Sequence, residues 1–144
     1  RWGLLTGTIG ALLAALAGPW LLSQFTRDAN VIAWGATLLW IAVVLEPGRV
    51  FNLVVINALR ATGDARFPVA VGSVSMLVVM AGGSWLLGVH FGLGLPGVWI
   101  AYTADEWIRG LLMAARWQRR GWLGHARATH RRVSRTRRVI GAQK

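Results

Sequence analysis

The chain has 144 residues, of which 55% are apolar and 15% are charged, and its mean hydropathy is +0.50. Soluble domains average about 25% charged residues, and one of this size cannot bury so much apolar surface. The composition therefore excludes a soluble globular protein and predicts an integral membrane protein. Cysteine is absent, which excludes a disulfide framework, a thiol nucleophile and a thiolate metal site.

The net charge of +11 comes almost entirely from the C-terminal end. From residue 116 onward there are ten Lys or Arg and no acid, whereas residues 1–115 carry six basic and five acidic side chains. Nucleic-acid binding is one explanation of so basic a segment, but the positive-inside rule is the simpler one. We expect residues 123–144 to form a basic cytoplasmic tail, disordered or lying on the membrane surface, with anionic lipids as its partner and no nucleic acid.

Residues 2–25 form the first predicted membrane span. They contain no charge, and about 20 apolar residues are enough for a helix to cross the hydrocarbon core. Small residues recur at four-residue spacing (Gly3 and Gly7, then Ala11 and Ala15), which allows a second helix to approach closely. Pro19 predicts a kink. In the polar turn that follows, Asp28 is placed to cap the next helix.

Residues 31–59 form the second predicted span, which has a polar stripe. At 100° per residue its polar side chains fall within an arc of about 140°. They are Glu46, Arg49, Asn52, Asn57 and Arg60. Pro47 removes a backbone donor and Gly48 loosens the helix further, so the sequence predicts a broken helix beside Glu46.

A turn and an uncharged span come next. Gly63 is a good left-handed helix stop, and Asp64 is predicted to cap the following helix and to be neutralised locally by Arg60 and Arg66. Residues 68–89 carry no charge and many small residues, which predicts a packing helix. The segment 90–97 is too rich in Gly and Pro to continue it.

Residues 98–117 form the fourth predicted span, and one face of it is polar at mid-depth. Six side chains fall within an arc of about 100°. They are Tyr102, Asp105, Glu106, Arg109, Met113 and Arg116. A charged group at the centre of a bilayer costs about 2.5–3.5 kcal/mol on insertion scales, so such residues face a protein interior or a water-filled path.

The loops predict the orientation. Arg1, Arg60, Arg66 and the tail lie on one side, and Arg27 and His90 lie on the other. Positive-inside counting then places both termini in the cytoplasm, which agrees with four spans. The sequence opens on Arg-Trp-Gly with no signal-peptide cleavage site, and we interpret the chain as a fragment or remnant of a longer membrane protein.

Three motifs, in order along the chain, resemble the multidrug and toxic compound extrusion family. Phe-Thr-Arg-Asp-Ala-Asn-Val-Ile (25–32) resembles the loop after the third helix of each six-helix lobe in that family. Leu-Arg-Ala-Thr-Gly-Asp-Ala-Arg-Phe-Pro (59–68) resembles the turn before the fifth helix, with Thr62 where the family usually has Gly or Ala. Gly-Leu-Gly-Leu-Pro-Gly-Val-Trp-Ile-Ala (92–101) resembles the start of the sixth.

The resemblance implies a twelve-helix transporter with two lobes around a central cavity, to which this chain supplies helices nine to twelve. Such proteins export organic, often cationic, compounds in exchange for Na⁺ or H⁺. The family's second-lobe cation site uses acids on helices seven and ten, and Glu46 is the acid on the span that matches helix ten. The partners implied are membrane lipids, small organic substrates and the missing N-terminal helices.

Two roles are open for the charged residues. Glu46 is either a cation or proton site, favoured by the neighbouring Pro47, or a fixed ion pair with Arg49. Asp105, Glu106 and Arg109 are better explained as a structural network in which one acid reaches across to Arg49. Trp107 is assigned to packing, with the lining of a substrate cavity as the alternative.

The leading function is part of a cation-coupled efflux antiporter of the plasma (inner) membrane, with Glu46 as coupling residue. Substrate-cavity or network positions are Arg49, Asn52, Asn57, Tyr102, Asp105, Glu106 and Arg109. The alternatives are a lipid-linked-sugar flippase, with a more cationic cavity, and a truncated, non-transporting scaffold. We expect no cofactor, no metal site and no enzymatic activity, because the histidines lack ligand spacing and the acids are paired with arginine.

Overall fold

The computed structural model describes residues 2–124 and 126–128, and this part of the chain contains helices and turns but no strand. Helix α1 spans Trp2–Leu16, α2 Gly18–Ser23, α3 Ala29–Ala61, α4 Arg66–Ser75 and α5 Gly94–Gln118. Between α4 and α5, the π-helices η1 (Met76–Gly82) and η2 (Trp85–His90) continue α4 without a break in the helix. Residue 125 and residues 129–144, most of the predicted tail, lie outside the described part.

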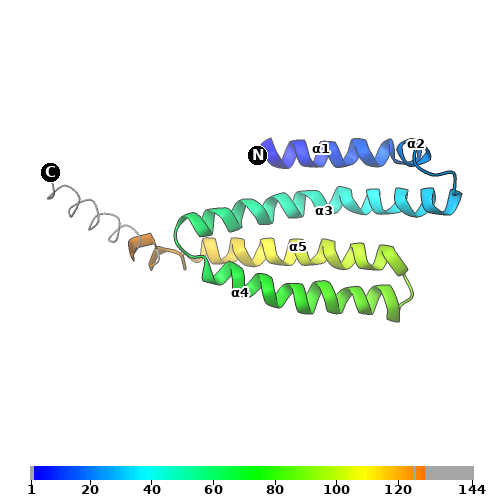
Figure 1. Cartoon of the computed structure of the whole chain (residues 1–144). Helices are drawn as coiled ribbons and strands as arrows, with labels where there is room; N and C mark the ends of the chain where they lie inside the picture. The colour runs from blue at the N-terminus through cyan, green and yellow to red at the C-terminus, as the bar shows by residue number, and fades with distance from the viewer. Residues whose placement is uncertain (1, 125, 129–144) are drawn as a thin grey trace, which may run out of the picture.

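The helices form one row in the order α1–α3–α5–α4 (Figure 1). Helices α3 and α5 run in the same direction at the centre, α1 and α2 cover the outer side of α3, and α4 with η1 and η2 covers the outer side of α5. The start of α1, the end of α3 and the end of α5 lie at one end of the row. This arrangement brings Arg60, Arg66 and Arg116 to the same end, as the loop charges predict.

The buried interior of this row is unusually polar. Apart from glycine and proline, five apolar and five polar residues of the described chain are buried. The apolar ones are Ala15, Leu45, Leu59, Ala101 and Met113, and the polar ones are Asn52, Asp64, Ser75, Asp105 and Glu106. Large apolar side chains such as Leu77 and Val89 lie outside and are about 70% exposed (72% and 69%). Apolar surface turned outward around a polar interior is typical of helices surrounded by lipid or by other apolar helices.

Two of these helices have the length and the apolar composition of a membrane span, namely Ala29–Ala61 and Arg66–His90. Helix α1 is apolar but shorter, and α5 carries four charged side chains. Helices therefore occur in all four regions where the sequence predicts spans. That each of the four crosses the membrane stays a prediction.

Glycine contacts join the outer helices to the central ones. A Cβ added at Gly3 or Gly7 would lie 3.5 or 3.3 Å from Val50 of α3, so the small residues of α1 do permit the close approach that their spacing predicts. Gly83 packs on Ala101 of α5 in the same way, at 3.2 Å. The third span is nevertheless mostly exposed in this chain, because only its narrow face toward α5 is covered.

Local breaks follow the sequence at some positions and depart from it at others. The first span is interrupted at Ala17, with Pro19 in the first turn of α2, as expected. Helix α3 ends at Ala61, and Gly63 in the turn after it has φ +89°, also as expected. Helix α3, in contrast, continues as an α-helix through Pro47, so the predicted break is wrong. The fourth helix begins at Gly94, earlier than residue 98, because Gly94 itself (φ +59°) closes the preceding turn.

The Asp28 cap predicts a measurable stabilisation of α3. Its Oδ1 accepts hydrogen bonds from the backbone N–H of Asn30 (2.8 Å) and Val31 (3.4 Å), which satisfies two donors of the first turn. Asp28→Ala is expected to cost about 1 kcal/mol, whereas Asp28→Asn keeps the acceptor and should cost much less. Thermal unfolding of the purified chain in detergent measures both, and equal losses would contradict the capping role.

Candidate functional site

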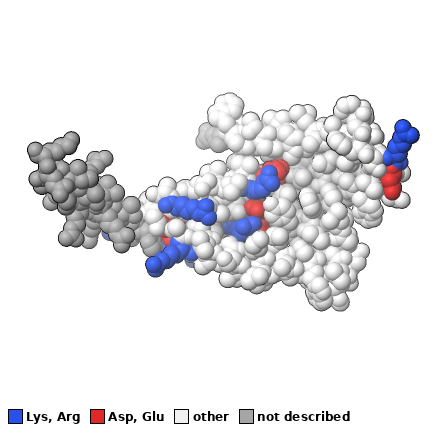
Figure 2. All heavy atoms as spheres, in the orientation of Figure 1, with Lys and Arg blue, Asp and Glu red and all other residues white. Residues whose placement is uncertain are grey.

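Charged side chains meet in the middle of the helix row. Figure 2 shows acidic and basic atoms in contact near the centre of an otherwise uncharged face, with further charge at the two ends. The central group comes from α3 and α5, which pack against each other along their length. It divides into a buried cluster on α5 and a more exposed ion pair on α3.

The buried cluster centres on Arg109. One guanidinium nitrogen, Nη2, lies 2.6 Å from Asp105 Oδ2 and 2.8 Å from Glu106 Oε1, so one arginine contacts both acids. This is possible because residues three and four apart share one face of a helix. The Asp105 side chain is 0% exposed, and those of Glu106 and Arg109 are 8% and 18% exposed.

Two neighbouring helices supply polar partners to this cluster. Asn52 of α3 donates from Nδ2 to Glu106 Oε2 at 2.7 Å, and the hydroxyl of Ser75, the last residue of α4, donates to Asp105 Oδ1. The predicted interhelical role of Asn52 is thus present, and the acids form a network, as expected. Ser75 was missed, since a serine in an uncharged helix carries no signal of its partner.

Two details of this network differ from the expectation. Neither Asp105 nor Glu106 pairs with Arg49, because Arg109 reaches both acids. Asn57 is exposed, although it shares the polar arc of α3, because its side of the helix faces away from α5. Within the described chain, Asn52 Oδ1, Asp105 Oδ2 and Arg109 Nε are buried without a hydrogen-bond partner.

The second group is the Glu46–Arg49 ion pair on α3. Arg49 Nη2 lies 2.7 Å from Glu46 Oε1, and the side chains are 44% and 22% exposed, respectively. Tyr102 of α5 lies within interaction distance of the Arg49 guanidinium. Both predicted members are therefore together, on a more open part of the α3 surface than the Arg109 cluster.

Trp107 fixes α5 against α3 beside Glu46. Its Nε1 donates to the backbone carbonyl of Val44 at 2.9 Å, and a Cβ added at Gly48 would lie 2.6 Å from the same nitrogen. Trp107 therefore packs on α3, and the alternative that it lines a substrate cavity stays a prediction. Gly48 is required here for the space it leaves and not for a break in the helix.

A third ion pair lies toward the basic end of the row. Arg116 Nε donates to Asp64 Oδ2 at 2.9 Å, and the Asp64 side chain is only 1% exposed. Arg116 also lies over the Phe67 ring, 4.8 Å from its centroid. Asp64 therefore has a partner 52 residues away, which the local explanation with Arg60 and Arg66 did not include.

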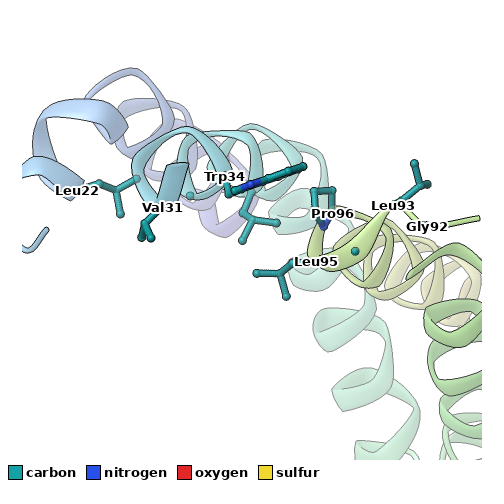
Figure 3. Close-up of a pocket in the computed structure, with 10 residues that line it drawn as sticks. Leu22, Val31, Trp34, Gly92, Leu93, Leu95 and Pro96 are labelled. Carbon is teal, nitrogen blue, oxygen red and sulfur yellow. The ribbon is translucent and has the colours of Figure 1, made fainter. Parts of the chain in front are cut away.

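An apolar hollow lies at the opposite end from Arg116. Its volume is about 540 Å³, and it is open to one side between the start of α3 and the turn before α5 (Figure 3). Trp34, Leu22 and Pro96 are among the residues that line it, and no charged side chain does. The charged groups of the central site therefore do not open into this hollow. Among the described residues, no group of three or more His, Asp or Glu side chains could hold a metal ion.

Comparison with known proteins identifies the family. The family model described as MatE matches residues 1–86, more than half of the chain. The chain belongs to the MatE family. This result agrees with the resemblance carried by the loop and turn motifs, and it makes the chain part of a helical membrane transporter family.

Curated relatives carry transporter names. The chain is 41% identical over 122 residues to the "Uncharacterized transporter YisQ" of Bacillus subtilis, an alignment that covers 85% of this chain and 27% of that protein. It is 27% identical to the "Probable multidrug resistance protein NorM" of Idiomarina loihiensis, over 77% of this chain and 25% of the relative. A NorM of Caulobacter vibrioides is 26% identical, over 81% and 25% respectively.

The chain thus spans about a quarter of the length of the curated relatives it matches. No solved structure matches it.

Proposed function

We propose that this chain is part of a secondary antiporter that exports organic, often cationic, compounds across the plasma membrane in exchange for a cation, H⁺ or Na⁺. Family membership and the relatives named multidrug resistance proteins support an efflux role. The remaining helices of the transporter would come from the part of the relatives that this chain does not cover. Membrane lipids surround the outward apolar faces.

The net charge of the central site is the observation that favours a cationic ligand. The two groups of the central site together hold three acids (Glu46, Asp105 and Glu106) and two arginines (Arg49 and Arg109), so the ionised site has one excess negative charge. A flippase for a lipid-linked sugar phosphate needs a cationic cavity, and this balance favours a cation instead.

Glu46 is our candidate for the coupling residue of the antiporter. Its carboxylate stands on the span that matches helix ten, it is 22% exposed, and one arginine is its ion-pair partner. A cation that reaches this side chain replaces Arg49 as the counter-charge, which requires only that the exposed Arg49 side chain swing away. A ligand that exchanges with an internal partner in this manner biases the equilibrium between two conformations.

The distribution of arginines supports a proposal for the orientation in the membrane. Arg60, Arg66, Arg116, Arg119 and Arg120 lie at one end of the helices, and Arg27 beside Asp28 lies at the other. We propose that the arginine-rich end faces the cytoplasm, together with both termini of the chain.

Glu46→Gln should abolish cation-driven efflux in the full-length gene product while leaving membrane insertion intact. The amide keeps the shape of the side chain but cannot provide the charge that binds the coupling ion, so we expect at least a tenfold fall, about 1.4 kcal/mol or more of lost coupling. Efflux of a fluorescent organic cation from proteoliposomes, driven by a pH or Na⁺ gradient, measures it.

The matched control is Asn30→Ala, an exposed polar residue in the first turn of α3, which should leave efflux unchanged. Unchanged efflux in Glu46→Gln would show that Glu46 is only a structural partner of Arg49.

A further inference from the structure

The excess negative charge of the central site belongs to the Arg109 cluster. The Glu46–Arg49 pair is balanced, and so is the Asp64–Arg116 pair. In the cluster, Asp105 and Glu106 share Arg109, and all three side chains are less than one-fifth exposed. An uncompensated charge in such surroundings is costly, so the cluster is matched to one additional positive charge.

The two acids differ in what their oxygens accept. Glu106 Oε1 accepts from Arg109 at 2.8 Å, and Oε2 accepts from the Asn52 amide at 2.7 Å. Guanidinium and amide nitrogens are donors only. Both oxygens of Glu106 therefore require the carboxylate form, and the pair of Glu106 with Arg109 is satisfied as an ion pair.

Asp105 contacts a hydroxyl group, which can either donate or accept a hydrogen bond. Oδ1 contacts the Ser75 hydroxyl, which accepts a hydrogen bond as readily as it donates one. Oδ2 lies 2.6 Å from Arg109 but makes no hydrogen bond, and the nearby Asn52 Oδ1 is also an acceptor without a donor. Around Asp105, which is 0% exposed, two acceptors (its own Oδ2 and Asn52 Oδ1) and one donor (Arg109 Nε) are thus without a hydrogen-bond partner.

We propose that Asp105 is a proton-binding carboxyl that alternates between ionised and neutral forms during the transport cycle. One H⁺ from water adds to Oδ1 of Asp105, and the cluster changes from a charge of −1 to 0. The new O–H donates to Ser75, whose hydroxyl reverses from donor to acceptor, and the same proton later returns to water. Glu106 and Arg109 keep their charges throughout.

This inference rests on the proposed antiporter function and names H⁺ as the coupling ion at a second position. The charged groups on the helices packed against Asp105 are consistent with a proton site at this residue. On the helix that runs from α4 through η2, the charged or titratable residues are Arg66 and His90, at its two ends. Helix α3 contributes Asn52, the neutral Glu46–Arg49 pair and, near its C-terminal end, Arg60. On α5 itself the neighbouring ionisable groups are Glu106, Arg109 and Tyr102. Arg109 is thus the cation beside Asp105.

The helix that carries Ser75 changes its hydrogen bonding at this contact. Ser75 ends α4, and the π-helix η1 begins at the next residue, Met76. π-helical segments are rare and are frequent at functional sites. A rearrangement at this junction would separate Ser75 from Asp105 and open the buried carboxyl to water.

The test is infrared difference spectroscopy of the full-length gene product in lipid, recorded between acidic and alkaline pH. A protonated carboxyl has a C=O stretching band separate from the amide bands. We expect this band in the wild type, in Glu46→Gln and in Glu106→Gln, and its loss in Asp105→Asn. Retention of the band in Asp105→Asn, or its absence from the wild type over the whole pH range, would overturn the proposal.

Ser75→Ala keeps the test decisive if Asp105→Asn does not fold. Removal of the hydroxyl leaves the protonated carboxyl without its acceptor, so the band should remain and move to higher frequency. A band at the wild-type frequency in Ser75→Ala would contradict the proposal.

The infrared spectrum tests the proton site and the transport assay tests the antiporter, so either proposal can be contradicted without the other. A wild type that exports organic cations but lacks the Asp105 band keeps the antiporter and loses the proton site. A wild type with the band but without efflux keeps the proton site and loses the antiporter.

Discussion

Arg109→Met is expected to destabilise the protein by about 3–5 kcal/mol, which is the usual cost of removing one partner from a buried ion pair. Methionine fills a similar volume, so the loss is electrostatic. Asp105 and Glu106 both lie within 2.8 Å of the Arg109 guanidinium, and Glu106 keeps only the Asn52 amide as a donor when the guanidinium is gone. Chemical unfolding of the purified chain in mixed micelles measures the change in free energy.

The controls separate the charge from the side-chain volume. Arg109→Met combined with Asp105→Asn and Glu106→Gln has no buried charge left in the cluster and should recover most of the lost stability. Arg49→Met removes an equally short ion pair whose arginine is 44% exposed, and it should cost much less. If Arg109→Met is as stable as the wild type, the cluster is not a structural ion pair.

The course of the helices could be predicted from the sequence, because it depends on local properties. Runs of apolar residues place the helices, and Gly63, Pro19 and the Gly-rich segment 90–97 place the turns, since each acts through its own backbone. The Asp28 cap is equally local. Pro47 failed as a helix breaker because the continuous packing of α3 on α5 outweighs the one hydrogen bond that proline removes.

The partners of the charged residues could be predicted only in part. Pairs within one helix, such as Glu46 with Arg49, follow from three- and four-residue spacing. Pairs between helices do not, because they depend on the rotation and depth of each helix relative to its neighbour. Asp64 pairs with Arg116, 52 residues away, and Asp105 pairs with Ser75, 30 residues away. The polar arc of α3 likewise does not predict that Asn52 is buried while Asn57 is exposed.

The packing of η2 on α5 explains why the motif at residues 92–101 has a glycine at position 97. A Cβ added at Gly97 would lie 2.7 Å from the backbone carbon and oxygen of Leu87 and 2.8 Å from the nitrogen of Gly88. Backbone atoms of a helix cannot turn aside as a flexible side chain can. The glycine of the Gly-Val-Trp sequence is therefore fixed by contact with the preceding helix, and it brings the two helices together just beyond the turn that joins them.

Gly97→Ala is accordingly expected to destabilise the protein by about 1–3 kcal/mol, the typical cost of forcing one extra group into a filled interior. Gly10→Ala is the matched control, because it adds the same methyl group to α1, where nothing lies within 4 Å. Alanine is the better helix former by about 1 kcal/mol, so the control should be neutral or slightly stabilising. Thermal unfolding of both variants distinguishes them. Helix propensity favours alanine at both sites, so a lower melting temperature for Gly97→Ala alone assigns the loss to the contact between η2 and α5. Equal melting temperatures for the two variants would show that the two helices are not held together at Gly97.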